Sequence, residues 1–424
     1  MYDVIIVGAR VAGSATALLL ARKGVKVLVV ERATFPSDTL STHNIQLPGV
    51  ARLKRWGLLD RIIAAGTPAA RHVIFDPGPV VLEGHFPSFE GIDALYSPRR
   101  TVLDKILVDA ARQAGAEVRE NFMVEDLVQE AGRVGGIRGR EKGGAALAET
   151  ADLVVGADGK QSLVARTVGA AAYHQKPALS LAFYTYWDGV PLQGGEMYGR
   201  ERRFIGAWPT NDGLVMTYVA WPIAEYHGFR ADVESAFLST LDLAGDLGQR
   251  ARNGRRVGPI RGTIDLPNYF RTPYGPGWAL VGDAGLVMDP VTGQGIGDAF
   301  RDAELLAEAI EAGLGGRQPL DVALAGYQER RDRAALPMYE FTTALASFGP
   351  PKPEERILMA ALRGKPAEIS RFLGVLTGAV PMQEYFTPRN LGKIIGVRGM
   401  ARMMLGKMRP ARPKLPRPVE VAAR

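Results

Sequence analysis

The chain has 424 residues, of which 46% are hydrophobic and 23% are charged. This length exceeds one compact core, and no apolar run reaches the roughly 18 residues of a membrane-spanning helix, so we expect a globular protein with two domains. The absence of cysteine excludes a redox dithiol, a catalytic thiolate and a cysteinyl-linked cofactor.

The net charge of +7 comes from the C-terminal segment 389–424, where Glu420 is the one acidic residue. The remainder of the chain is therefore close to neutral, and nucleic-acid binding is not predicted. No charged-then-apolar leader precedes the first strand, so we expect no cleaved signal and a cytoplasmic location.

The first predicted elements form a nucleotide-binding turn. The β-branched run from Asp3 to Val7 indicates a buried parallel strand, and a helix is expected over Ser14–Lys23. Between them, Gly8 allows a tight turn and Gly13 allows close packing of helix on strand. Backbone N–H groups at such a helix start favour a pyrophosphate. Arg10 replaces the usual middle glycine, and its guanidinium either contacts a phosphate or stabilises the turn.

A second strand is predicted over Val25–Val30 and ends at Glu31, which Arg32 follows. A carboxylate at this place accepts hydrogen bonds from a ribose diol and disfavours a 2′-phosphate. FAD or NAD therefore fits this turn, whereas NADP does not. The alternative is a glycine turn without a ligand.

The next segments lead to a second signature. Arg99 and Arg100 precede an amphipathic helix over Val102–Ala114. A hairpin is expected over Val124–Arg140, and its glycines at 135–139 are interpreted as turn residues because no helix follows them. The strand Asp152–Gly156 then carries Ala157-Asp158-Gly159.

Residues 173–229 are rich in aromatic side chains and alternate like strands. We interpret them as a sheet whose aromatic face covers a ligand. A second hydrophobic core explains any single one of these residues equally well. The candidates for the substrate pocket are Tyr184, Tyr186, Trp208 and Tyr218.

The third signature follows a buried strand over Trp278–Gly282. It consists of Gly282-Asp283-Ala284, then Asp289-Pro290, then Gly293-Gln294-Gly295-Ile296. Helices are expected over Gly297–Glu311 and over Tyr327–Phe348, the latter with a kink at Pro337.

The three signatures in this order resemble the FAD-dependent monooxygenases built like para-hydroxybenzoate hydroxylase, over about residues 1–345. Geranylgeranyl-reductase-like enzymes and flavin halogenases are related to them. The resemblance implies an α/β fold in which a Rossmann-like FAD-binding domain (1–72, 96–170 and 272–345) is interleaved with a substrate-binding β-sheet domain (73–95 and 171–271). A C-terminal helical region (346–408) and a basic, proline-rich tail (409–424) would follow.

The resemblance also implies roles for single residues around a non-covalent FAD. Glu31 would lie at the adenosine ribose, Asp283 would hold the ribityl hydroxyls, and Pro290 would lie beside the isoalloxazine. The full set of implied cofactor-binding residues is Gly8, Val11, Ala12, Gly13, Glu31, Arg32, Arg100, Val124, Asp158, Asp283, Pro290, Gly293, Gly295 and Ile296. N–H groups of Gly295 and Ile296, at a helix start, would stabilise the anionic reduced flavin.

Two positions depart from the family pattern. Arg166 follows Ser162 by four residues instead of three, and Gly285-Leu286 stands where many hydroxylases have Ala-His. A role for Arg166 is therefore not assigned, and a close relation to the phenol hydroxylases is not expected.

The reaction implied by the resemblance is monooxygenation. NAD(P)H would dock briefly and reduce FAD, O2 would give a C4a-hydroperoxide, and oxygen would pass to an apolar or aromatic small molecule. A C=C reductase similar to geranylgeranyl reductases is the first alternative, and a halogenase is another, although only Trp208-Pro209 remains of its Trp-x-Trp-x-Ile-Pro marker. A flavin-binding protein without turnover is a further one.

His43 lies in a polar loop that passes near the flavin in this family. It is a candidate acid/base or flavin hydrogen-bond donor, and the alternative is a structural loop histidine. The histidines show no metal-ligand spacing, so no metal is predicted.

The C-terminal segment has two interpretations. Leu391, Ile394, Ile395, Met400, Met403, Met404 and Met408 lie on one face of a basic helix. Such a helix either contacts an anionic membrane surface weakly or packs against the body with a solvated basic end.

Overall fold

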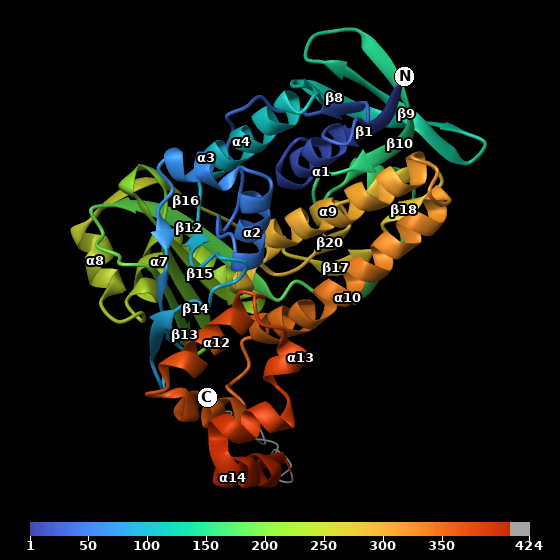
Figure 1. The fold of residues 1–424 in the computed structure, drawn as a ribbon. Coiled ribbons are helices and arrows are strands. Elements are labelled where there is room, and N and C mark those ends of the chain that lie inside the picture. The colour runs from blue at the N-terminus through green and yellow to red at the C-terminus, as the bar shows by residue number, and fades with distance from the viewer. Residues whose placement is uncertain (408–424) are drawn as a thin grey trace, which may run out of the picture.

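A mostly parallel sheet forms the centre of the upper half of the molecule, in a computed structural model that describes residues 1–407 (Figure 1). Its strands run in the order β18 (Tyr274–Gly275), β19 (Trp278–Leu280), β10 (Ala146–Gly156), β1 (Tyr2–Val7), β2 (Val27–Val30) and β7 (Glu117–Arg119). All neighbours along this path are parallel except β18 and β19. The inner strands are buried on both faces because helices and a hairpin cover them.

Helices cover one face of this sheet and a hairpin covers part of the other. Helix α1 (Val11–Ala21) packs against α4 (Arg100–Gln113) and α9 (Gly295–Leu314), and α9 packs against α10 (Leu320–Ala346). The hairpin consists of β8 (Phe122–Glu130) and β9 (Arg133–Glu141), which pairs with the outer half of β10. Helix α5 (Leu163–Thr167) follows β10 on the hairpin side.

A second sheet combines two distant parts of the chain. Its order is β16 (Arg255–Thr263), β12 (Ser180–Asp188), β15 (Val215–Pro222), β14 (Arg203–Pro209), β13 (Gly195–Arg200), β4 (His72–Asp76) and β5 (Leu82–His85). One face packs on the small helices α6 (Tyr226–Ala231), α7 (Val233–Leu241) and α8 (Leu247–Asn253). The other face joins the main core beneath α1 and α9. The α/β class with interleaved parts is therefore confirmed.

The remaining elements connect these layers. Helices α2 (Leu47–Arg55) and α3 (Leu59–Ala64) precede the pair β3 (Ala69–Ala70) and β6 (Leu95–Tyr96). A three-stranded sheet consists of β11 (Ala172–Lys176), β17 (Asn268–Arg271) and β20 (Leu286–Val287). Four C-terminal helices are α11 (Pro353–Leu362), α12 (Pro366–Leu376), α13 (Met382–Tyr385) and α14 (Pro388–Lys407), and α14 lies at the opposite end of the molecule from the N-terminus (Figure 1).

Three local expectations need correction. Helix α9 begins at Gly295, not Gly297, and α10 begins at Leu320, not Tyr327, and contains Pro337. The glycines at 135–139 lie inside strand β9, not in a turn. Gly136 and Gly139 are needed there for close strand approach, because a Cβ would lie 2.1 Å from the Glu149 carbonyl oxygen or 2.2 Å from that of Met123, whereas Gly135 faces open space.

Candidate functional site

The first and second signatures meet at Gly8. This glycine has a φ of 101°, and a Cβ on it would lie 2.5 Å from the carbonyl oxygen of Ala157. A Cβ on Gly13 would lie 1.9 Å from the Gly8 carbonyl oxygen. Glycine is required at both positions because the backbone segments approach too closely for any side chain. The turn after β1 is therefore pressed against the end of β10, which carries Asp158.

The third signature also packs against the start of α1. Gly282 has a φ of 62°, and a Cβ on it would lie 2.7 Å from the Cβ of Ala12, in the first turn of α1. Three segments that are far apart in the sequence are thus brought together around the start of α1. No side chain caps that helix start, so its first N–H groups remain available for an anion.

Glu31 lies at the end of β2 and is buried. One of its carboxylate oxygens accepts a hydrogen bond from the Ala9 N–H (2.9 Å), and the other accepts one from the Ala33 N–H (3.0 Å). A carboxylate has further lone pairs, so these two bonds orient Glu31 and leave acceptor capacity for a ribose diol.

Asp283 and Gly295 are both accessible to solvent near this turn. The protein around Asp283 raises the pKa of its carboxyl. Gly295, the first residue of α9, is also exposed, and the space next to its Cα is open. An acidic group beside one open helix start and close to another fits the ribityl chain, ring and pyrophosphate of FAD.

Arg100 and Arg10 share one carboxylate. Asp104 is fully buried and accepts two hydrogen bonds from Arg100 (2.9 and 3.1 Å) and one from Arg10 (2.7 Å). Arg10 also donates to the Ser37 hydroxyl at 3.1 Å. Arg10 therefore stabilises the turn and the following loop through Asp104. Sequence reasoning missed Asp104, although its position four residues after Arg100 on a helix suggests such a pair.

The other predicted cofactor residues are more peripheral. Asp158 uses one oxygen to accept from the Leu163 N–H (2.7 Å) at the start of α5, and its second oxygen is buried without a partner. Val124 is half-buried on β8, and Arg32 is exposed. Arg166 donates to the Gln161 carbonyl oxygen, within its own segment.

The loop before α9 is held by residues that precede α2. Gln46 donates to the Thr292 carbonyl oxygen at 2.9 Å, and Gly293 takes a left-handed φ of 64° directly beside it. Pro290 begins the short turn Pro290–Thr292. Sequence reasoning missed Gln46 and its neighbour Asn44, because only the fold brings them to this loop.

Asp289 links this loop to the second sheet. It accepts a hydrogen bond from the Ser180 hydroxyl at 2.5 Å and one from the Val291 N–H at 3.1 Å. Burial raises its pKa to about 6. The second sheet is therefore attached next to Pro290.

The predicted aromatic residues share the sheet face that points toward this loop. Tyr184 and Tyr218 are paired across β12 and β15, and both hydroxyls are buried without a hydrogen-bond partner. Trp208 packs over Gly195, where a Cβ would lie 1.9 Å from its ring. Tyr186 lies on the same face as Tyr184, with ring centres 5.7 Å apart.

His43 lies against these tyrosines. It is fully buried, has a left-handed φ of 62°, and its ring centre lies 5.5 Å from that of Tyr184. Its Nε2 is hydrogen-bonded to the Tyr186 hydroxyl, and its Nδ1 has no partner. Burial, followed by the charges of Arg100 and Arg99, lowers the pKa of His43 to about 3. The imidazole is therefore neutral at physiological pH.

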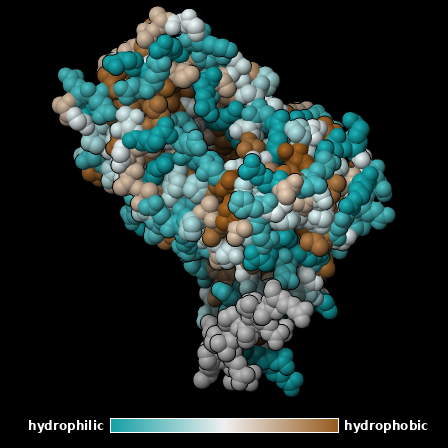
Figure 2. All heavy atoms as spheres, turned by 180° about the vertical axis from the view of Figure 1, so that it is seen from behind, coloured by the Kyte–Doolittle hydropathy of each residue, from teal (hydrophilic) through white to brown (hydrophobic). Residues whose placement is uncertain are grey.

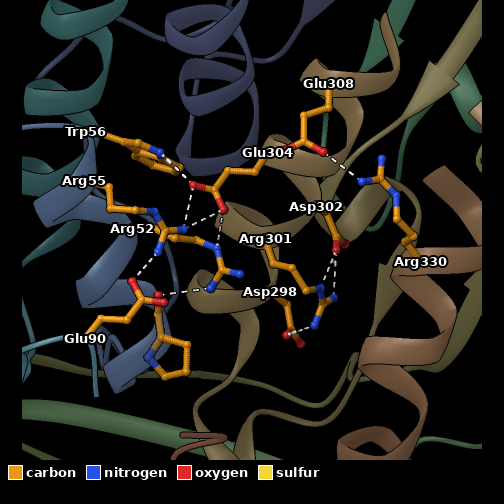
Figure 3. Close-up of polar contacts among 11 residues, drawn as sticks. Arg52, Arg55, Trp56, Glu90, Asp298, Arg301, Asp302, Glu304, Glu308 and Arg330 are labelled. Carbon is orange, nitrogen blue, oxygen red and sulfur yellow. Dashed lines mark hydrogen bonds and ion pairs between the residues drawn. The ribbon is translucent and has the colours of Figure 1, made fainter. Parts of the chain in front are cut away.

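An ion-pair cluster fixes α2 on α9 close to this site (Figure 3). Glu304 accepts hydrogen bonds from Arg52 (2.8 Å), Arg55 (3.0 Å) and the indole N–H of Trp56 (3.0 Å). A Cβ on Gly49 would lie 3.2 Å from the Cα of Gly297, so the two helices also touch at the first turn of α9.

The surface seen from behind carries apolar residues in separate groups among polar ones (Figure 2). Within residues 1–407, no helix combines the length and the apolar character needed to cross a membrane. The same part of the chain contains no group of three or more histidine, aspartate or glutamate residues that could hold a metal ion.

Comparison with known proteins gives relatives of several activities. Digeranylgeranylglycerophospholipid reductase of Methanothrix thermoacetophila is 27% identical over 347 residues, 77% of this chain and 82% of that protein. Kynurenine 3-monooxygenase of Salinispora tropica is 26% identical over 365 residues, 80% of this chain and 79% of that protein.

Solved structures share the fold. The flavin-dependent brominase Bmp2 has a TM-score of 0.77 at 19% identity, with 96% of this chain and 99% of that chain covered. PqsL, a probable FAD-dependent monooxygenase from Pseudomonas aeruginosa, has a TM-score of 0.67 at 22% identity, with 88% and 99% covered.

A family model described as an FAD binding domain matches residues 1–235, more than half of the chain. This match confirms FAD as the predicted cofactor. The protein belongs to the FAD binding domain family and is an FAD-dependent oxidoreductase of the monooxygenase superfamily.

Proposed function

We propose that this flavoprotein is an NAD(P)H-dependent monooxygenase that oxygenates a small aromatic molecule. One observation carries the proposal. The sheet face toward the loop before α9 (residues 289–294, here called the flavin loop) combines aromatic rings with unpartnered polar atoms, the hydroxyls of Tyr184 and Tyr218 and the Nδ1 of His43. Buried polar atoms without partners are costly, so a ligand that satisfies them is favoured over a plain hydrocarbon chain. Kynurenine 3-monooxygenase is a relative, and PqsL has been solved with 2-aminobenzoylacetate.

FAD, when bound, supplies electron transfer and oxygen activation. The chain's residues would bind and orient it: Val11, Ala12 and Gly13 at the pyrophosphate, Glu31 at the ribose, and Asp283 at the ribityl hydroxyls. The N–H groups of Gly295 and Ile296 at the start of α9 would stabilise negative charge on the ring.

The sheet would supply the substrate side of the site. Tyr184, Tyr186, Trp208 and Tyr218 are all buried on this face. They would hold an aromatic ring, orient its polar groups and exclude water from the reacting atoms.

A C=C reductase is the second candidate. It is favoured by the methanogen reductase that matches 77% of this chain. A reductase of this kind would saturate a prenyl substrate without consuming oxygen.

The discriminating experiment uses the FAD-reconstituted protein with NADH and NADPH, following cofactor oxidation, oxygen uptake and peroxide together. A monooxygenase consumes oxygen and releases less peroxide when its substrate is present. No oxygen uptake with either nicotinamide would remove the proposal. Saturation of prenyl substrates under anaerobic conditions would establish the reductase instead.

A further inference from the structure

His43 is surrounded by polar atoms that have no partner. Five buried side-chain atoms around the flavin loop and the adjoining sheet face make no hydrogen bond: His43 Nδ1, Asn44 Oδ1, Gln46 Oε1, Tyr184 OH and Tyr218 OH. They come from one short loop segment and from two neighbouring strands. Such a concentration of unpaired buried groups is rare in native proteins unless a ligand pairs with them.

The direction of the hydrogen bond to Tyr186 determines which imidazole nitrogen carries the proton. Burial raises the pKa of Tyr186, so its hydroxyl stays protonated, and a phenol hydroxyl can either donate to His43 Nε2 or accept from it. A neutral imidazole that accepts at one nitrogen carries its single N–H on the other. When Tyr186 donates, the single N–H of His43 is on Nδ1, the atom without a partner.

The surrounding charges oppose a second proton on this ring. Arg99 and Arg100 lie at the start of α4, and Tyr184 and Tyr186 face the ring from β12. The Arg99 guanidinium lies 5.1 Å from the centre of the Tyr186 ring. Asp38, in the loop that carries His43, pairs with Arg261 at 2.9 Å. The ring is thus packed among aromatic groups, with two cations as its nearest charges.

The backbone also holds His43 in this orientation. Its left-handed φ of 62° is unfavourable for a histidine, and its backbone N–H donates to the Ser41 hydroxyl at 3.0 Å. A strained residue with a fully buried side chain and one free donor is typical of a ligand contact.

We propose that Tyr186 donates to His43 Nε2, that the resulting Nδ1–H of His43 is a fixed hydrogen-bond donor to a carbonyl-type oxygen of the bound ligand, and that His43 does not act as a general base. This inference rests on the proposed function, because it places the ligand between the flavin loop and the sheet. A carbonyl-type oxygen is present both on the flavin ring and on a ketone or carboxylate substrate, and the experiment separates these two sources.

Two amide substitutions test the donor position. His43→Asn places an amide N–H where Nδ1 lies, and asparagine tolerates the left-handed backbone. His43→Gln places its amide near the position of Nε2 and leaves no donor at Nδ1. His72→Gln, on the surface-facing strand β4 where His72 pairs with Glu83 at 3.0 Å, is the control.

The first measurement is FAD affinity and the visible spectrum of bound flavin without substrate. The second is the binding of 2-aminobenzoylacetate, which carries a ketone and a carboxylate, followed by its perturbation of the flavin spectrum. If the flavin accepts the hydrogen bond, His43→Gln weakens FAD binding about tenfold more than His43→Asn does. If the substrate accepts it, the two variants bind FAD equally, and the tenfold difference is found in the binding of 2-aminobenzoylacetate. Equal effects of the two substitutions in both measurements overturn the inference.

A spectroscopic measurement distinguishes a donor from a base. In holoenzyme labelled with 15N-histidine, the signals of His43 are assigned as those that are missing from the His43→Asn variant. From pH 5 to 8 these signals should show a neutral ring that is protonated at Nδ1. A ring that titrates within this range would identify a general base and overturn the inference. Neither measurement requires turnover, so failure of the monooxygenase assay remains a separate result.

Discussion

At the scale of single residues, Glu31 is the proposed partner of the FAD ribose. Both of its oxygens accept backbone N–H groups of the turn. In Glu31→Gln, the amide nitrogen cannot accept, so one N–H loses its partner and the ribose loses an anionic acceptor. We expect FAD to bind about tenfold more weakly or worse, as measured by flavin fluorescence. Glu125→Gln, in the exposed pair with Arg140 on the hairpin, should leave FAD affinity unchanged.

His43 predicts an acid sensitivity of the fold. Its folded-state pKa of about 3 lies below the unfolded value of 6.5. The unfolded chain therefore binds the proton more readily, and the stabilisation by neutral His43 is complete above pH 6.5 and is lost as the pH falls toward 3. The slope is about 1.4 kcal/mol per pH unit in this window. His43→Asn should unfold in urea with a shallower pH dependence between pH 6 and 4, and an identical slope would contradict the assignment.

At the scale of elements, the contact of α2 with α9 positions both sides of the flavin loop. Residues 43–46 enter α2, and Gly295 begins α9, so any movement between the helices changes the site. Glu304 is the shared acceptor in this contact (Figure 3). Its removal leaves the largely buried guanidinium of Arg52 without a counter-charge.

We therefore expect Glu304→Ala to lower the free energy of unfolding by about 3 kcal/mol, because breaking a buried ion pair leaves an uncompensated charge. Glu308→Ala, four residues along α9, removes only the exposed pair with Arg330 and should cost about 0.5 kcal/mol or less. Urea denaturation of the two variants tests this difference. Equal losses would show that the Glu304 contacts do not hold α2 in place.

At the scale of the whole molecule, the described part of the basic C-terminal segment packs on other helices through its apolar residues. Ile394 is buried, Leu391 and Ile395 are half-buried, and α14 contacts α11. Gly396, with a φ of 68° and ψ of 174°, interrupts the helix. The side chains of Met403 and Met404, the residue Met408 and the predicted tail 409–424 lie outside the described residues. The described residues of the predicted apolar face, Leu391, Ile394 and Ile395 among them, mainly contact other parts of the protein.

This arrangement favours weak, purely electrostatic contact with membranes. Val397 is 88% exposed and lies among exposed basic residues. We expect co-sedimentation with phosphatidylserine vesicles that disappears at high salt and does not change in Val397→Ser, because screening removes surface electrostatics. Binding that persists in salt and is lost in Val397→Ser would show insertion of the helix. Phosphatidylcholine vesicles serve as the uncharged control.

A feature of this protein could be predicted from the sequence where it depends on residues that are close together in the chain. The strand, glycine turn and helix that begin the chain could be predicted because Gly8, Gly13 and Glu31 satisfy needs of the neighbouring backbone. The same is true of the glycines around α9, and together these patterns determined the fold class and the FAD cofactor. The starts of α1, α4 and α9 were predicted within three residues, because several residue types are tolerated in a first turn, whereas the start of α10 was predicted seven residues too late.

Only the tertiary structure decided the contacts within the site. Arg10 needed Asp104 as its partner, Gln46 holds the loop at Thr292, and His43 bonds to Tyr186, which lies 143 positions further along the chain. No local pattern specifies such pairs, because each side chain meets its partner only after the sheets and helices have packed. The sequence by itself determined which cofactor the fold binds; packing decided that His43 is neutral, buried and left with one free nitrogen.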